Sequence, residues 1–126
     1  MIKYCVSLCC NDISSLISKL KDVKDKTDFI EIRIDKFKKF DLELLRKFDI
    51  KRMILTLRSK TNGGFYTGSE ESRINILKNL LNFGFGFIDI EYDIPKQDLK
   101  WFLENKKSTK VILSFHNFNK LQSSGI

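Results

Sequence analysis

The sequence predicts a single α/β domain whose parallel strands begin to close into a barrel. Segments with the two-residue period of a strand alternate with segments of helical spacing along the 126 residues. This order favours parallel strands joined by right-handed crossovers. Within the strands, apolar residues alternate with polar ones, whereas parallel strands buried on both faces usually read as continuous apolar runs. A barrel explains the difference, because one face of each strand then points to the helices and the other to the barrel axis.

The first strand is expected at residues 3–8, where Val6 and Leu8 lie on either side of Ser7. A helix follows at 12–23. Asp12 is suited to cap its first turn. Its apolar residues recur at helical spacing and predict a buried stripe: Ile13, Leu16, Ile17 and Leu20.

The second strand, at 29–34, carries the most informative pattern in the chain. Residues 28–35 read D-F-I-E-I-R-I-D, so three isoleucines alternate with Glu31, Arg33 and Asp35. Buried charges cost several kcal/mol each unless they are paired, so such a face indicates a specific use for them. A short helix is expected after this strand, at 42–48.

The third strand is expected at 52–57 and ends in Arg58, with Thr56 on the same polar face. Gly63 and Gly64 then indicate a loop, which lets backbone approach a ligand closely. The next helix, at 69–83, opens with Ser69 as a cap and ends at a glycine.

The fourth strand, at 87–92, alternates isoleucines with Asp89, Glu91 and then Asp93. Pro95 is suited to open the helix expected at 95–105. The fifth strand, at 110–115, runs into His116, the single histidine of the chain. The last residues, 121–126, have the composition of a loop.

Composition narrows the class of protein. The hydrophobic fraction of 42% and the 11 phenylalanines predict a packed core rather than disorder. No apolar run approaches the roughly 20 residues of a membrane span, and the N-terminus lacks the features of a signal peptide. We therefore expect a cytoplasmic protein without membrane contact. Cys5, Cys9 and Cys10 are expected to be reduced structural thiols, because no histidine lies near them in sequence to complete a zinc site.

The net charge of +7 comes mainly from lysine. It has two interpretations: a solvated lysine-rich surface, or attraction to an anionic partner such as a nucleic acid, a small carboxylate or a phosphate. The longest basic run is only residues 36–39, and no aromatic RNA-binding motif is present. We therefore expect no nucleic-acid partner.

Polar residues gather at the expected carboxyl ends of the strands, which is where catalytic groups lie in parallel α/β barrels. Each has a structural interpretation of its own: an ion pair of Glu31 with Arg33, a solvated Arg58, a structural His116. Together they favour proton transfer on a polar anion, with a histidine as acid or base and arginines as bidentate anion ligands. Glu31, Asp89 and Glu91 are expected to lie deeper and pair with basic residues. The residues at the strand ends are Ser7, Arg33, Arg58, Asp93 and His116.

Five short motifs, in order along nearly the whole chain, resemble those of the type I 3-dehydroquinate dehydratase family. The resemblance implies the first five strands of a (β/α)₈ TIM barrel over residues 1–126. It also implies conversion of 3-dehydroquinate to 3-dehydroshikimate in the shikimate pathway, through a lysine Schiff base and without metal or organic cofactor. Full-length members are expected to be homodimers. The motifs are Val6-Ser7-Leu8, Glu31-Ile32-Arg33-Ile34-Asp35, Leu55-Thr56-Leu57-Arg58-Ser59-Lys60 with Gly63-Gly64, Ile88-Asp89-Ile90-Glu91, and Ser114-Phe115-His116-Asn117-Phe118.

The resemblance also implies roles for individual residues. His116 would transfer protons while the imine forms and breaks and while water is lost. Glu31 would orient His116 and touch the substrate. Ser7, Arg33 and Arg58 would bind substrate oxygens.

The chain departs from the family in two respects. Asn62 stands four residues after Arg58, where the family usually has glutamate. The Schiff-base lysine of the family lies on the sixth strand, beyond Ile126, and Lys120 is the least implausible substitute. The chain alone is therefore expected to be an inactive part of the enzyme, with open sheet edges that favour association. The alternative is a non-catalytic half-barrel that binds a small carboxylate.

Overall fold

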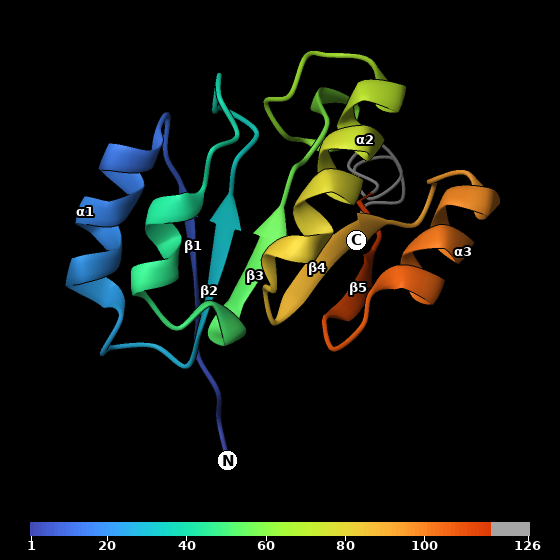
Figure 1. Ribbon diagram of the computed structural model, residues 1–126. Helices are drawn as coiled ribbons and strands as arrows, with labels where there is room; N and C mark the ends of the chain where they lie inside the picture. Colours follow the sequence, from blue (N-terminus) through green and yellow to red (C-terminus); the bar gives the residue numbers. More distant parts are fainter. Residues whose placement is uncertain (117–126) are drawn as a thin grey trace, which may run out of the picture.

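The structure is a computed structural model and describes residues 1–116, in which five parallel strands form one sheet. Neighbours in the sheet are also neighbours in sequence, as the arrows in Figure 1 show. This order is that of a barrel wall, in which every crossover advances by one strand. The predicted fold class is therefore confirmed. The strands are β1 (Cys5–Cys9), β2 (Phe29–Arg33), β3 (Met53–Thr56), β4 (Phe87–Glu91) and β5 (Lys110–Ser114).

Three α-helices connect the strands: α1 (Ile13–Val23), α2 (Glu70–Leu80) and α3 (Lys96–Asn105). The side chain of Asp12 caps α1 by accepting a hydrogen bond from the amide of Ser15, as predicted. Ser69 caps α2 by accepting from the amide of Ser72.

The predicted helix at 42–48 is a 3₁₀ helix instead, η1 (Glu43–Lys47), and a second, η2 (Ile50–Arg52), precedes β3. Leu42, the N-cap residue of η1, makes no capping hydrogen bond through its side chain, and five residues are too few to sustain an α-helix unaided. The helix expected at 69–83 ends as a 3₁₀ turn, η4 (Leu81–Phe83), before Gly84, which has a φ of 98°.

The apolar strand residues face the helices, as the alternation predicted. Ile32, Leu55 and Ile90 are fully buried in one cluster with residues of α1, α2 and α3. Burying one such side chain contributes roughly 1.5–3 kcal/mol. The opposite face of each strand carries the polar residues, and we call it the inward face.

β5 is the exception on the helical side of the sheet. Leu113 is 55% exposed and Phe115, just after the strand, is 56% exposed, whereas Val111 near the start of β5 packs against the core. The ring of Phe115 contacts that of Tyr92, with ring centroids 4.5 Å apart.

Candidate active site on the inward face

The inward face places one hydroxyl on each side of the Glu31 carboxylate. Strand register sets Ser7 of β1 beside Glu31 of β2, and the Ser7 hydroxyl donates to Oε1. From β3, the Thr56 hydroxyl donates to Oε2 over 2.7 Å. Both oxygens of Glu31 therefore accept a hydrogen bond, one from each neighbouring strand.

Arg58 follows β3 and lies between two carboxylates. Its Nη2 is 3.9 Å from Oε2 of Glu31 and 3.3 Å from Oδ2 of Asp89. Ser114 of β5 donates to the same Asp89 oxygen over 3.1 Å. The predicted pairing of Glu31 and Asp89 with a basic residue is thus confirmed, and Arg58 is that residue.

The guanidinium of Arg58 retains hydrogen-bonding capacity. Its side chain is only 14% exposed, and within residues 1–116 no group accepts a hydrogen bond from its buried Nε. An orphaned buried donor is costly, so this nitrogen favours binding of a further anionic or carbonyl oxygen.

Arg33 pairs with Asp35 and not with Glu31. Its Nη2 donates to Oδ2 of Asp35 over 2.7 Å, and its Nε donates to Oδ1 over 3.3 Å. The same Asp35 oxygen, Oδ2, accepts from the amide of Phe65 over 2.9 Å. The ion-pair interpretation of Glu31 with Arg33 is therefore wrong. The side chain of Asp35 is fully buried, and its hydrogen bonds link the end of β2 to the loop after β3.

The loop after Arg58 folds back on it. Lys60–Asn62 form a 3₁₀ turn, η3, that ends at Gly63 with a φ of 85°. A Cβ on Gly64 would lie 2.3 Å from the carbonyl oxygen of Arg58, closer than real Cβ atoms approach. We expected the glycine pair to let backbone approach a ligand. The close approach in the structure is instead to the backbone of Arg58.

Arg73 of α2 holds a second buried group of charges. It is 1% exposed and donates through Nη1 to the carbonyl of Leu57, 2.9 Å away. Its Nη2 lies 3.2 Å from Oε2 of Glu91, and it also pairs with Glu70. Asn62 donates to the same Glu91 oxygen over 2.7 Å. We call these four side chains, Arg73, Glu70, Glu91 and Asn62, the Arg73 cluster.

The Arg73 cluster explains two points raised by the sequence. Glu91 pairs with a basic residue as predicted, but the base comes from a helix. Asn62, where the family usually has glutamate, acts as a neutral donor to a buried carboxylate. Sequence reasoning missed Arg73, although its place beside Ile74 on the buried stripe of α2 was a usable signal.

His116 lies two residues beyond Ser114 and is half-buried. The prediction that Glu31 orients it stays a prediction. Asp93, also expected at the strand ends, is exposed. The last motif residues, Asn117 and Phe118, and the candidate Lys120 lie outside the described residues.

Burial raises the pKa of the Asp89 carboxyl, and Arg58 and Ser114 oppose this shift. The pKa of Glu91 is raised for the same reason, against the opposing effect of Arg73. A carboxyl whose pKa is higher in the folded than in the unfolded chain binds its proton more tightly when folded. Its contribution to stability therefore falls as the pH rises from the unfolded toward the folded pKa.

We expect Asp89→Asn to remove one such titration. From about pH 4 up to the raised folded pKa of Asp89, the wild type should lose stability relative to the variant. Urea unfolding at a series of pH values measures the difference in unfolding free energy. Gln97→Ala, on α3, removes no titrating group and should differ from wild type by a constant. If the wild type instead became more stable relative to Asp89→Asn as the pH rises, the predicted direction of the stability change would be wrong.

Two further properties concern residues 1–116 only. No helix there is long and apolar enough to cross a membrane. No group of three or more His, Cys, Asp and Glu side chains there could hold a metal ion. Cys5, Cys9 and Cys10 are free thiols, and partial burial raises the pKa of each.

Known proteins are similar to this chain in both sequence and fold. A family model described as type I 3-dehydroquinase matches residues 4–125. The 3-dehydroquinate dehydratase of Methanococcus maripaludis is 32% identical over 118 residues, or 92% of this chain and 54% of the relative. That of Methanocaldococcus jannaschii is 30% identical over 121 residues, or 94% of this chain and 55% of the relative.

Among solved structures, type I 3-dehydroquinate dehydratase from Clostridium difficile, with covalently modified comenic acid, aligns with a TM-score of 0.75 at 25% identity. The alignment covers 98% of this chain and 59% of that one. The chain thus spans about half the length of the curated relatives it matches.

Proposed function

Because the chain belongs to the type I 3-dehydroquinase family, we propose that it forms the substrate-binding and proton-transfer half of a 3-dehydroquinate dehydratase. The observation that carries the proposal is Arg58, buried between Glu31 and Asp89 with a spare Nε. 3-Dehydroquinate carries a carboxylate and several hydroxyl groups, which are the partners that a guanidinium binds through paired hydrogen bonds.

The proposed reaction removes a proton from C2 of the substrate and expels the neighbouring C1 hydroxyl as water. His116 is assigned the proton transfer, since imidazole changes charge near neutral pH. Ser7, Arg33 and Arg58 are assigned the substrate oxygens, and Glu31 the orientation of His116. The imine that makes C2 acidic is assigned to a lysine of the sixth barrel strand, outside residues 1–126.

A cytoplasmic location and a homodimer of the whole protein belong to the same proposal. The three free thiols support the first of these, since disulfides are rare in reducing compartments.

The first test separates binding from covalent chemistry. We expect the chain of residues 1–126 to bind 3-dehydroquinate saturably but to leave it unconverted. Borohydride, which reduces an imine to a stable amine, should yield no adduct by mass spectrometry. An adduct on any lysine of this chain would overturn the assignment of the imine to a lysine outside it. An absence of saturable binding would overturn the proposal that 3-dehydroquinate is the substrate.

The alternative, a non-catalytic half-barrel that binds a small carboxylate, gives the same result in that experiment. A fusion of this chain to the C-terminal part of the Methanococcus maripaludis enzyme separates the two. The proposed function predicts formation of the conjugated product, followed by its ultraviolet absorbance, and loss of turnover in His116→Asn. A folded fusion that binds substrate without turnover would favour the alternative.

A further inference from the structure

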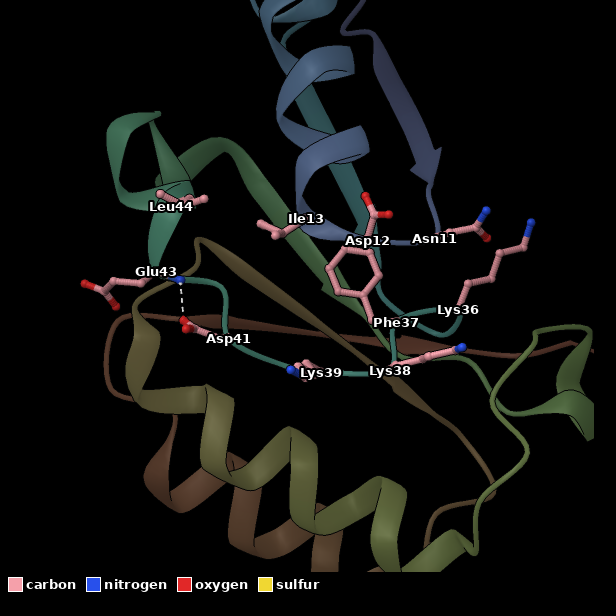
Figure 2. Close-up of a pocket in the computed structure, with 10 residues that line it drawn as sticks. All are labelled: Asn11, Asp12, Ile13, Lys36, Phe37, Lys38, Lys39, Asp41, Glu43 and Leu44. Atoms are coloured by element: carbon pink, nitrogen blue, oxygen red, sulfur yellow. Dashed lines mark hydrogen bonds between the residues drawn. The ribbon is translucent and has the colours of Figure 1, made fainter.

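A cavity lies at the same end of the strands but outside the inward face. It has a volume of about 840 Å³, within the range of small-molecule sites. One wall is the start of α1 with Asn11 before it, and the other runs from Lys36, after β2, to Leu44 in the first turn of η1. Figure 2 shows residues 36–39 running along one side, with Asp12 and Ile13 opposite. The residues assigned to the substrate do not line this cavity.

The cavity offers an apolar surface. Phe37 is 6% exposed and belongs to the core, so its ring is held in place. Ile13 packs against the same core. Leu44, which is 47% exposed, extends this surface toward solvent. An apolar side chain that remains half in water is stabilised further when a ligand covers it.

The formal charges of the lining residues balance, but most of them are already engaged. The carboxylate of Asp12 accepts from the amide of Ser15 over 2.8 Å. That of Asp41 accepts from the amide of Glu43 over 3.2 Å, and Glu43 itself pairs with Arg46 over 2.9 Å.

The three lysines that line the cavity differ in their contacts. Lys36 places its Nζ 4.4 Å from the centroid of the Phe65 ring, a cation–π contact. Lys38 and Lys39 are exposed, and neither forms an ion pair with any other residue that the structure describes. Two ammonium groups are therefore available beside an apolar wall. This run of residues is also the basic run that the sequence singled out and that the proposed function does not use.

We propose that this cavity binds a small amphipathic anion. Its phosphate or carboxylate group pairs with the ammonium group of Lys38 or of Lys39, which extend in different directions (Figure 2), and its apolar body covers Ile13, Phe37 and Leu44. Phosphate esters and carboxylates share the feature that is recognised, a compact oxyanion on an apolar body. The site is independent of the substrate assigned to the inward face.

Phenyl phosphate is the probe for this proposal, added to the purified protein and followed by the backbone amide signals in nuclear magnetic resonance spectra. We expect saturable shifts that are largest at residues 11–13 and 36–44. Inorganic phosphate, which lacks the apolar body, should bind about tenfold more weakly or worse. The neutral ester phenyl acetate lacks the charge and should not compete with phenyl phosphate. The carboxylate anion phenylacetate should compete with it.

The lysine side of the site is tested by the double variant Lys38→Gln with Lys39→Gln, which should weaken phenyl phosphate binding about tenfold or more. The matched control removes the same charge from α3, through Lys96→Gln with Lys100→Gln, and should change affinity less than about twofold. Both pairs are exposed, so the fold is expected to persist. Equal losses in the two double variants, equal affinity for inorganic phosphate, or an absence of saturable shifts would each overturn the proposal.

Discussion

Replacing Arg73 with methionine is expected to lower the free energy of unfolding by about 3–5 kcal/mol. Methionine fills much of the same space but leaves Glu91 buried without its cation, and Glu91 is only 2% exposed. It also removes the donor to the Leu57 carbonyl. A buried carboxylate that loses its counter-charge either stays ionised at high cost or takes up a proton.

Denaturant unfolding at neutral pH measures the effect. Lys100→Met removes a cation from an exposed pair with Glu104 and should cost less than about 1 kcal/mol. Adding Glu91→Gln to Arg73→Met removes the uncompensated charge while keeping an acceptor for Asn62. The double variant should therefore regain part of the loss. A single variant within about 1 kcal/mol of wild type would show that the Arg73 cluster does not stabilise the fold.

Replacing Arg58 with methionine should weaken binding of 3-dehydroshikimate, the proposed product, about 30-fold or more, which corresponds to about 2 kcal/mol. The variant loses the spare Nε and also the cation between Glu31 and Asp89. An anionic ligand would then meet two carboxylates without a counter-charge.

Isothermal titration calorimetry measures this affinity, and denaturant unfolding shows whether the variant is folded. Arg58→Lys keeps the charge but not the planar fork, so an intermediate affinity is expected. Arg46→Met, at an exposed arginine paired with Glu43, should bind as the wild type does. If wild type binds and Arg58→Met binds equally well, Arg58 is not the anion ligand. If wild type does not bind, the proposed substrate is wrong.

Alternation in the strands predicted the sheet and its inward face, because period two follows from backbone geometry alone. It also predicted that Glu31 and Asp89 pair with a base. The choice of Arg58 over Arg33 could not be read from the sequence. Arg33 and Asp35 are two residues apart and pair locally, whereas Arg58 reaches carboxylates 27 and 31 positions away through the strand register.

Contacts between layers were the least predictable. Arg73 is a helix residue whose partners outside α2 are Leu57, after β3, and Glu91, at the end of β4, and no local sequence pattern encodes contacts over that separation. The close approach of Gly64 to Arg58 likewise depends on how a loop returns over its own start. The 3₁₀ form of residues 43–47 reflects an apolar residue, Leu42, at the N-cap position and too few residues, which propensity alone does not reveal.

The arrangement of Arg58 between two carboxylates also makes ligand binding a proton-linked event. With both carboxylates ionised, these three groups sum to one negative charge, and an anionic ligand adds to it. Protonation of Asp89, whose pKa burial already raises, would offset that charge. Binding should therefore draw protons from the buffer. The measured binding heat would then vary with the buffer's ionisation enthalpy, and affinity would decline as the pH rises.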